Sequence, residues 1–436
     1  MYIASKFNVI KEKNGWKVIY NTMTQEIDQL SEEAERYLRE GGEISSETLA
    51  SLKEKGILID SAADEDKVLS QLRKKYVSEP ESLFLYLLPT EECNFRCKYC
   101  YEEFRHIWMS QETQDGIIEY VKTNISRYKF LRVEWFGGEP LLALNAIEYM
   151  SKKLIDICRQ NHVLYYACMT TNAYTLDLHT FERLRKCKVL SYQITIDGPP
   201  AVHDNQRILK NGQGTFARIM ENLIAIKDHV KTRMLDVTIR INVSRDMLRG
   251  IYGFIDDLYE KLLIDKRFNL LLKPVSNYGG DRVRDFEEQL CGIQDIQQAV
   301  DYCTEKGIIS PEDDLSVGGN VCYASRNASW VIGADGSLYK CTVLLYDENN
   351  IVGRVRSNGV FEVDENKLSR WVCSGTDHGL GCDECQYAPI CLKSVCYKRI
   401  LCGQENGCHF VRESVDKRMD QYIKERRDNN NESSEY

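Results

Sequence analysis

The chain has 436 residues, a length that suggests roughly two to four domains. Its 57 Lys and Arg against 66 Asp and Glu residues give a formal net charge of -9. This balance argues against a nucleic-acid surface, which binds by neutralising phosphates. The start, MYIASKFNVIKEKNG, lacks the apolar segment of a secretion signal, and no apolar run reaches the ~18 residues of a membrane span, so we expect a cytoplasmic protein without a membrane partner.

The first 75 residues contain no cysteine and have the patterns of a small α+β domain. The predicted elements are strands at 7–10, 16–19 and 26–27, helices at 31–40 and 46–55, and a strand at 57–59. Asn14-Gly15 is a typical turn between the first two strands. The charged segment 62–80 is predicted to be a helical connector to the next domain.

The middle of the chain alternates strand and helix patterns. Strands are predicted at 83–89, 131–136, 164–172, 190–198, 236–244 and 269–275, with helices between them. Six such units in a row predict a parallel sheet, curved or closed, of the α/β class. Cys158 shares an apolar helix face and is expected to be a core residue.

Polar or glycine-rich segments follow four of these strands. They are the loop of Cys93, Cys97 and Cys100, the Gly137-Gly138-Glu139-Pro140 segment, Thr171-Asn172, and Asp197-Gly198. The carboxyl ends of parallel strands meet at one edge of the sheet, where such folds place their chemistry. We therefore expect the functional site at this edge.

Cys93, Cys97 and Cys100 have the spacing C-x3-C-x2-C. In a reducing compartment, clustered cysteines indicate metal binding or catalysis. Three thiolates can hold three irons of a [4Fe–4S] cluster and leave the fourth iron open to a small molecule with an amine and a carboxylate. The alternative is a zinc site that takes a distant fourth cysteine, but this spacing directly after a first strand is not typical of a zinc hairpin.

The segment C-N-F-R-C-K-Y-C (93–100) resembles the signature of radical S-adenosylmethionine (SAM) enzymes. The resemblance implies a partial (β/α)6 TIM-like barrel over 82–300, a [4Fe–4S] cluster, bound SAM, and a flavodoxin- or ferredoxin-type electron donor. In that family, a 5′-deoxyadenosyl radical made from SAM takes a hydrogen atom from the substrate. The implied SAM contacts are Tyr99 near the adenine, Gly137, Gly138, Glu139 and Pro140 at the methionine amine, Asn172 and Gln193 at other polar groups, and Arg207 at the carboxylate.

Nine cysteines lie between Cys322 and Cys408, and their spacing resembles the SPASM domain that follows the barrel in many peptide-modifying radical enzymes. The resemblance implies two auxiliary [4Fe–4S] clusters within 301–426. One would take Cys322, Cys341 and Cys396, and the other Cys382, Cys385, Cys391 and Cys408. Zinc is the alternative here as well.

The chain departs from the SPASM pattern where four residues, not three, separate Cys391 from Cys396. This leaves open whether Cys402 or Cys408 is the last ligand. The first auxiliary cluster could take a fourth thiolate from Cys303, Cys373 or Cys402, or it could keep an open iron.

The order of elements in residues 1–75 resembles the winged-helix-like domain that binds leader peptides in maturases of ribosomally made peptides. A structural cap on the barrel is the alternative. If the resemblance holds, a leader would add a strand to the edge of the small sheet. The polar tail, 427–436, is predicted to be disordered.

These resemblances predict a radical SAM peptide maturase with three [4Fe–4S] clusters. The favoured reaction is an oxidative cross-link in a ribosomal precursor peptide, as a thioether from cysteine sulfur to carbon. Carbon–carbon or carbon–oxygen cross-linking is an alternative, as is formylglycine formation on a sulfatase, although such maturases normally lack the first domain. A non-enzymatic electron carrier or scaffold would need neither an open iron nor the GGEP segment.

Overall fold

The computed structural model describes residues 2–278, 282–308, 315–373, 381–403 and 408–432. The chain forms two compact units. The barrel unit comprises Glu81–Glu312 and Ser329–Lys367, and the terminal unit comprises Met1–Pro80, Asp313–Ala328 and Leu368–Tyr436. The units differ from the three predicted domains because the two ends of the chain share one unit.

Six parallel strands form the centre of the barrel unit, in the order β11-β10-β9-β8-β7-β6. They are β6 (Ser82–Leu87), β7 (Phe130–Trp135), β8 (Leu164–Thr171), β9 (Val189–Thr195), β10 (Asp236–Val243) and β11 (Phe268–Pro274). Each lies within three residues of its predicted range, because each is an apolar run bounded by polar or turn residues. The prediction of an α/β fold with a partial TIM-like barrel is confirmed.

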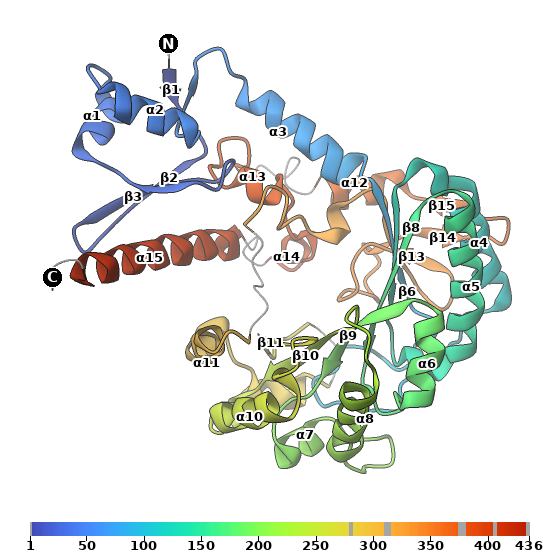
Figure 1. Ribbon diagram of the computed structural model, residues 1–436. Coiled ribbons are helices and arrows are strands. Elements are labelled where there is room, and N and C mark those ends of the chain that lie inside the picture. Colours follow the sequence, from blue (N-terminus) through green and yellow to red (C-terminus); the bar gives the residue numbers. More distant parts are fainter. Residues whose placement is uncertain (1, 279–281, 309–314, 374–380, 404–407, 433–436) are drawn as a thin grey trace. The chain divides into compact units, whose positions relative to one another are not determined.

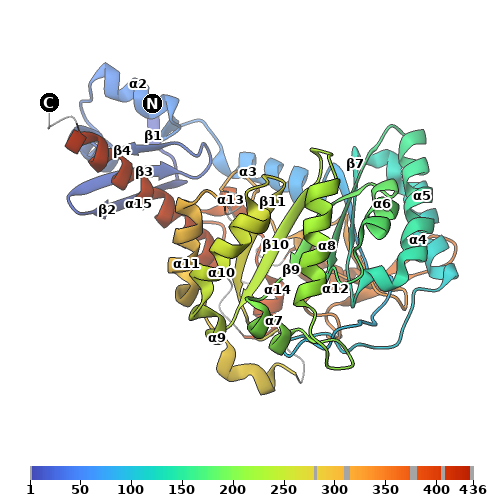
Figure 2. The same cartoon turned by 60° about the horizontal axis from the view of Figure 1, so that its bottom comes forward.

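Helices follow the strands and lie along the outer side of the curved sheet (Figures 1 and 2). They are α4 (Gln111–Asn124), α5 (Leu144–Gln160), α6 (Leu178–Lys186), α7 (Pro200–Gln206), α8 (Phe216–His229), α9 (Arg245–Leu248), α10 (Ile251–Leu258) and α11 (Ile293–Glu305). Single turns of 3-10 or π-helix occur at η2 (Ile125–Arg127), η3 (Pro140–Ala143), η4 (Tyr259–Leu263) and η5 (Arg284–Gln289). Cys158 is 1% exposed on α5, which confirms it as a core residue.

The sheet continues beyond its first barrel strand. The additional strands are β12 (Ser329–Ile332), β13 (Ser337–Tyr339), β14 (Ile351–Val355) and β15 (Phe361–Val363). β12 pairs in parallel with β6, and the last three strands are antiparallel. The β12–β13 connection is a turn at Asp335-Gly336, where Gly336 has a φ of +83°. The hairpin that leads to Cys341 therefore belongs to the barrel unit.

The terminal unit begins with the predicted small sheet. β2 (Asn8–Lys13), β3 (Trp16–Asn21) and β4 (Ile27–Gln29) form an antiparallel sheet, and β1 (Tyr2–Ala4) pairs with β5 (Leu58–Asp60). The helices are α1 (Glu32–Glu40), α2 (Ser46–Glu54), α3 (Glu65–Arg73) and the π-helical turn η1 (Lys74–Ser78). The hydroxyl groups of Ser31 and Ser45 cap α1 and α2. The winged-helix assignment of these elements stays a prediction.

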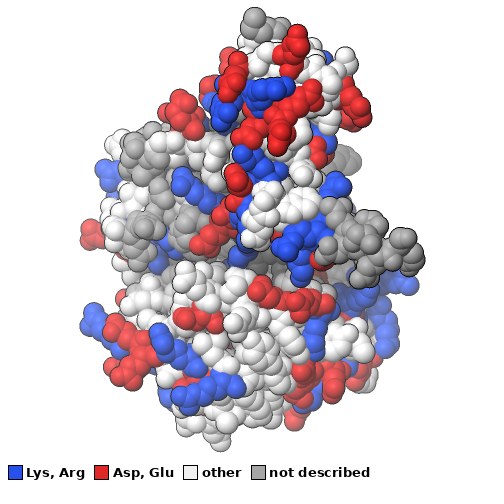
Figure 3. Space-filling model, turned by 90° about the vertical axis from the view of Figure 1, so that its left-hand side faces the viewer, with Lys and Arg blue, Asp and Glu red and all other residues white. Residues whose placement is uncertain are grey.

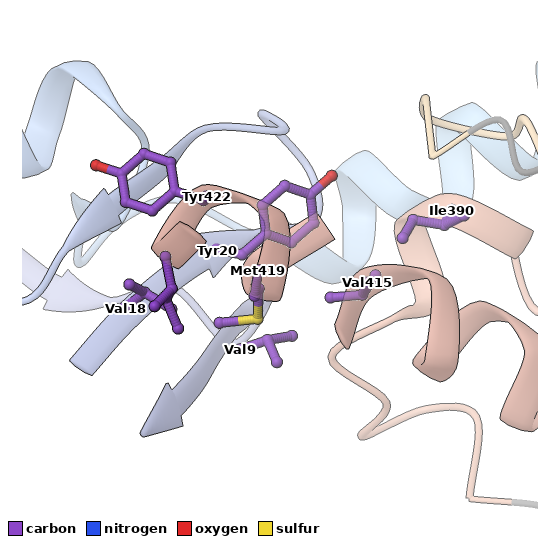
Figure 4. Packing of buried hydrophobic residues seen from close by; sticks show 8 residues of the cluster. Val9, Val18, Tyr20, Ile390, Val415, Met419 and Tyr422 are labelled. Atoms are coloured by element: carbon purple, nitrogen blue, oxygen red, sulfur yellow. The ribbon is translucent and has the colours of Figure 1, made fainter. Parts of the chain in front are cut away.

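The end of the chain packs on this small sheet. Its elements are η6 (Tyr323–Ser325), α12 (Glu365–Val372), α13 (Ala388–Cys391), α14 (Tyr397–Leu401) and α15 (Cys408–Glu432). Val9, Val18 and Tyr20 of the sheet meet Val415 and Met419 of α15 in one apolar cluster (Figure 4). Asp420 of α15 also binds Lys11 and Lys13 of β2, each at 2.7 Å. The first and last segments are therefore parts of one core.

Helix α15 corrects the prediction for the tail. It continues through Glu432, so residues 427–432 are helical rather than disordered, and 433–436 lie outside the described residues. Extending an existing helix adds one hydrogen bond for each residue fixed, and a polar composition does not prevent this.

Acidic and basic side chains are intermixed on the face shown in Figure 3, as the similar totals of the two kinds suggest. Among the described residues, no helix is long and apolar enough to cross a bilayer.

Candidate functional site

The cysteine triplet lies in the long connection between β6 and α4, at the carboxyl end of the first barrel strand. Two backbone hydrogen bonds tie this loop to the segment after α7: Arg96 N donates to Ile208 O at 2.8 Å, and Lys98 N donates to Gln206 O at 3.0 Å. The Arg105 guanidinium also donates two hydrogen bonds to the Glu91 carboxylate, of 2.7 and 3.1 Å. These contacts hold the triplet loop to the rest of the barrel edge.

The three thiols of the triplet lie close together. Burial raises the pKa of Cys93, and the neighbouring charges of Cys97 and Cys100 raise it further. Burial also raises the pKa of Cys97 and of Cys100. The positive charge of the Arg207 guanidinium partly opposes both shifts. Such thiols need a compensating cation to become thiolates, which the irons of a cluster provide.

Three thiols on one loop are a donor set that suits an iron–sulfur cluster. In the part of the chain that the structure describes, no three Cys, His, Asp or Glu side chains are placed to hold one metal ion. The thiolates of an iron–sulfur cluster instead bind different irons, so they need not converge on one point. The backbone N–H of Phe95 also donates to the Cys93 sulfur, at 3.4 Å, as donors commonly do to cluster thiolates.

The Gly137-Gly138 segment after β7 packs directly against the triplet loop. Gly137 has a φ of +107°, which favours glycine. A Cβ atom on Gly138 would overlap with the carbonyl oxygen of Glu92. The absence of side chains lets Gly138 N and Glu139 N donate to the carbonyl oxygens of Thr90 and Glu92, at 3.2 and 2.9 Å. The two glycines therefore position Glu139 beside the cysteines.

Glu139 is the buried acceptor of this edge, with 1% of its surface exposed. Its carboxylate accepts from Thr171 Oγ1 at 2.6 Å and from Asn172 N at 2.7 Å. Burial raises the pKa of Glu139, and these hydrogen bonds oppose the shift. Asn172 Nδ2 lies 3.9 Å from the Cys93 sulfur. The ends of β7 and β8 therefore meet at the triplet, as the sequence predicts for the carboxyl edge.

Tyr99 and Arg207 belong to a second buried network at the same edge. The Tyr99 hydroxyl donates to Asp197 and accepts from Arg207 Nη1 at 2.7 Å and from Asn242 Nδ2 at 3.1 Å. Burial raises the pKa of Asp197, and the Arg207 charge opposes this shift. Among the described atoms, buried Arg207 Nε has no hydrogen-bond partner. It thus keeps one donor for a ligand such as a carboxylate.

Gln193 is the exception among the expected SAM contacts. Its side chain lines a cavity of about 400 Å³ on the inner face of the barrel sheet, together with Glu134 and Thr170. Gln193 lies two residues before the end of β9 at Thr195. It therefore lies one layer of side chains below the edge.

Sequence reasoning missed three polar residues of this region: Asn242, Glu102 and Glu134. Asn242 is near the end of β10, a position that the carboxyl-edge rule could have found. Burial and the nearby carboxylates of Glu91 and Glu139 raise the pKa of Glu102 to about 8. Side chains alternate between the two faces of a strand, and the neighbours of Glu134 on β7 face the helices. The Glu134 side chain is therefore predicted to face the inside of the barrel.

The terminal unit contains a cavity of about 290 Å³ lined by six cysteines: Cys322, Cys382, Cys385, Cys391, Cys396 and Cys408. Burial and the neighbouring thiols raise the pKa of Cys391 to about 12 and that of Cys382 to about 11. All four cysteines expected at the second auxiliary cluster are thus in one place, in a chemical setting that suits iron–sulfur binding. Cys402 is exposed and does not line this cavity, which favours Cys408 as the last ligand.

The remaining expected ligand, Cys341, belongs to the barrel unit. It is buried and lies just after β13. Burial raises the pKa of Tyr101, the residue after Cys100, and the nearby charges of Glu102, Cys100 and Cys341 raise it further. Cys303 is a core residue of α11, and burial raises its pKa to about 12. Such a site resembles that of a structural cysteine more than that of a cluster ligand.

With this geometry established, three comparisons with known proteins are informative. Residues 87–254 match the Radical SAM superfamily. The chain is 24% identical to a cysteine-type anaerobic sulfatase-maturating enzyme of Clostridium novyi, over 71% of this chain and 87% of that protein. It is 23% identical to the radical SAM cyclopropyl synthase TigE of Paramaledivibacter caminithermalis, over 40% of each chain.

Among solved structures, the fold is similar to that of native anSMEcpe with bound AdoMet and Cp18Cys peptide. The TM-score is 0.54 and the identity 19%, over 71% of this chain and 88% of that one. The chain therefore contains a radical SAM domain over residues 87–254, and this match supports an enzymatic role with SAM and one [4Fe–4S] cluster as cofactors.

Proposed function

We propose that this enzyme installs an oxidative cross-link in a ribosomally synthesised precursor peptide. The favoured bond is a thioether between a cysteine sulfur and a carbon atom. Cys93, Cys97 and Cys100 would hold the radical-generating cluster, and Glu139, Asn172 and the Arg207 network would hold SAM. When bound, these cofactors supply a radical that removes a hydrogen atom from the substrate. A flavodoxin- or ferredoxin-type protein would supply the electron.

The observation that carries this proposal is the small open-edged sheet in the terminal unit. In the described residues, β2 and β4 each pair only with β3, so each has a free edge. A peptide can bind such an edge as an additional strand through main-chain hydrogen bonds. We propose that residues 1–75 bind the leader of the precursor.

The cysteine-lined cavity supports the oxidative part of the proposal. A cross-link removes two hydrogens from the peptide, but the radical step removes only one hydrogen atom. A second electron must therefore leave, and an auxiliary iron–sulfur cluster is a suitable acceptor. Cys382, Cys385, Cys391 and Cys408 would hold one such cluster, and Cys322, Cys341 and Cys396 would hold another.

Sulfatase maturation is the second candidate, and the similarity to the Clostridium novyi enzyme favours it. That similarity covers 71% of this chain but 87% of the relative. The unmatched share is therefore larger in this chain than in the relative. Mass spectrometry of the treated peptide distinguishes the two candidates. Formylglycine formation changes a single residue, whereas a cross-link connects two residues. A carbon–carbon or carbon–oxygen cross-link is tested by the same measurement.

The free edges allow a sharp test of leader binding. Thr22 N donates to Phe7 O at 3.0 Å, so by antiparallel alternation the N–H of Ile10 points away from β3. Asn21 N likewise donates to Glu26 O at 2.9 Å, so the N–H of Ile27 points away from β3 on the other edge. Proline at Ile10 or Ile27 removes that outward donor without removing a hydrogen bond of the sheet.

We expect one of the variants Ile10→Pro and Ile27→Pro to weaken binding of a synthetic leader at least about tenfold, equivalent to ~1.4 kcal/mol. Isothermal titration calorimetry measures the affinity. The controls Ile10→Thr and Ile27→Val keep a β-branched side chain and the N–H, and should bind the leader as the wild type does. If both proline variants keep wild-type affinity, the leader does not add a strand to this sheet.

Point variants are preferable here to a shortened chain that begins at Ser82. Removing the first segment would also expose Val415 and Met419 of α15, which pack against Val9 and Val18. Loss of turnover would then report damage to the cysteine-rich segment as much as loss of the leader site.

A further inference from the structure

Glu134 places a carboxyl group inside the barrel. It lies on β7 between Val133 and Trp135, which are buried against the helices. Because side chains alternate along a strand, Glu134 faces the inner side of the sheet. The strand register puts Tyr86 on β6 and Cys168 on β8 directly beside it. Glu134 therefore belongs to an inner layer of side chains that lines the 400 Å³ cavity.

The cavity lies below the residues that meet around the triplet. Glu134 is three residues before Gly137, which corresponds to ~10 Å along an extended strand. Thr170, which also lines the cavity, precedes Thr171 and Asn172, the residues that bond to Glu139. A substrate side chain could extend from this cavity toward the carboxyl edge of the sheet, where the cofactor site is expected. It would then pass the Glu134 carboxylate.

The surroundings of Glu134 suit proton transfer. Burial raises the pKa of Glu134 to about 7, and hydrogen bonds with Thr170, at 3.0 Å, and Cys168 oppose the shift. The charged and titratable groups nearby are Tyr86, Cys168, Arg132 and Asp236. Burial and the Glu134 charge raise the pKa of Cys168 to about 11, so this thiol stays protonated at neutral pH. A carboxyl group that is half ionised near pH 7 can accept a proton and release it again.

We propose that Glu134 is the general base of the peptide oxidation. This inference rests on the proposed function and deepens it. The substrate loses a hydrogen atom from carbon, and the broken C–H bond leaves a carbon radical and 5′-deoxyadenosine. The substrate thiol gives its proton to the Glu134 carboxylate as its sulfur bonds to that carbon. The remaining electron would pass to an auxiliary iron–sulfur cluster, which Cys382, Cys385, Cys391 and Cys408 would hold. The peptide thereby loses two hydrogens.

A general base of this kind is needed whichever bond is made. In a carbon–oxygen link the proton comes from a hydroxyl group, and in a carbon–carbon link it comes from the second carbon. The role of Glu134 can therefore be tested before the bond type is known.

The test compares Glu134→Gln with wild type on the precursor peptide, with product and 5′-deoxyadenosine quantified together. General-base catalysis contributes about 10²- to 10⁴-fold, so we expect product formation to fall by at least ~10²-fold. Formation of 5′-deoxyadenosine should fall much less. The ratio of 5′-deoxyadenosine to product should therefore rise. Glu134→Asp, which keeps the carboxylate, should recover part of the product. Glu119→Gln, at a carboxylate of α4 that pairs with Lys122 and does not line the cavity, is the matched control and should behave as the wild type.

The pH profile provides a second readout. A base must be ionised, so wild-type product formation should fall as the pH drops through about 7, where Glu134 becomes protonated. This limb should be missing in Glu134→Gln.

Wild-type product formation by Glu134→Gln would overturn the assignment, and so would a loss of product and 5′-deoxyadenosine in equal proportion, which would indicate a role in shaping the site. If the wild-type enzyme itself makes no product lacking two hydrogens, the proposed function fails instead.

Discussion

Replacing any one of Cys93, Cys97 and Cys100 by alanine should abolish the cleavage of SAM to 5′-deoxyadenosine under dithionite. Each thiolate would bind a different iron of the cluster, so none can substitute for another. The loop is also held by contacts in which the three thiols take no part, namely the Arg105–Glu91 pair and the backbone bonds to residues 206–210. The variants should therefore fold and fail only in chemistry.

The measurement is chromatography of 5′-deoxyadenosine from anaerobically reconstituted protein. Cys187→Ala is a matched control, because Cys187 is a buried thiol of the same unit far along the chain from the triplet. It should keep the cleavage activity. A triple variant of the triplet that makes 5′-deoxyadenosine at the wild-type rate would show that the radical is generated elsewhere.

The second large effect is expected at the cysteine-lined cavity of the terminal unit. Cys391→Ala should lower the iron content by about four atoms per chain, because a [4Fe–4S] cluster that loses a ligand is easily lost. The cluster would join the loop before α13, the end of α13 and the start of α15, so its loss should also destabilise the cysteine-rich segment. Cross-linked product should disappear, while cleavage of SAM should remain measurable.

Iron analysis and electron paramagnetic resonance check this prediction. Cys402→Ala is the informative comparison, because Cys402 is exposed and does not line the cavity. It should keep its full iron content, whereas Cys408→Ala should lose as much as Cys391→Ala. The reverse result for Cys402 and Cys408 would move the last ligand to Cys402. Full iron in Cys391→Ala would mean that the cavity holds no cluster.

The strands and helices were largely predictable because their signals are local. Each barrel strand is an apolar run of typical length, and the rule that parallel strands present their carboxyl ends at one edge grouped the triplet, Glu139 and Asn172 correctly. Ser31 and Ser45 similarly mark helix starts that the structure confirms.

The packing of the two chain ends could not be predicted from the sequence. Val18 and Met419 are apolar residues with correct periodicity in their own elements, but periodicity shows that a face is buried and not what covers it. The same limit explains why 329–367, expected in the cysteine-rich domain, extends the barrel sheet through β12 and β6. Pairing of strands so distant in sequence depends on the whole fold.

Glu134 was missed for a different reason. A motif search selects residues by their spacing from known partners, and Glu134 has no such partner. It becomes visible only when strand alternation and the cavity are considered together. Gln193 shows the converse, since the resemblance implied a SAM contact, whereas its side chain lines the inner cavity two residues before the end of β9.

The central claim is that the enzyme cross-links a peptide through cysteine sulfur, and mass spectrometry of the processed precursor tests it most directly. The precursor is expected to be a short cysteine-rich peptide encoded beside the enzyme. Reaction products should be measured with and without a thiol-alkylating reagent, using the Cys93→Ala enzyme as the inactive control. We predict a loss of two hydrogens and of one alkylatable cysteine for each link. A loss of two hydrogens with every cysteine still alkylatable would contradict the thioether, and a precursor of unchanged mass would contradict cross-linking altogether.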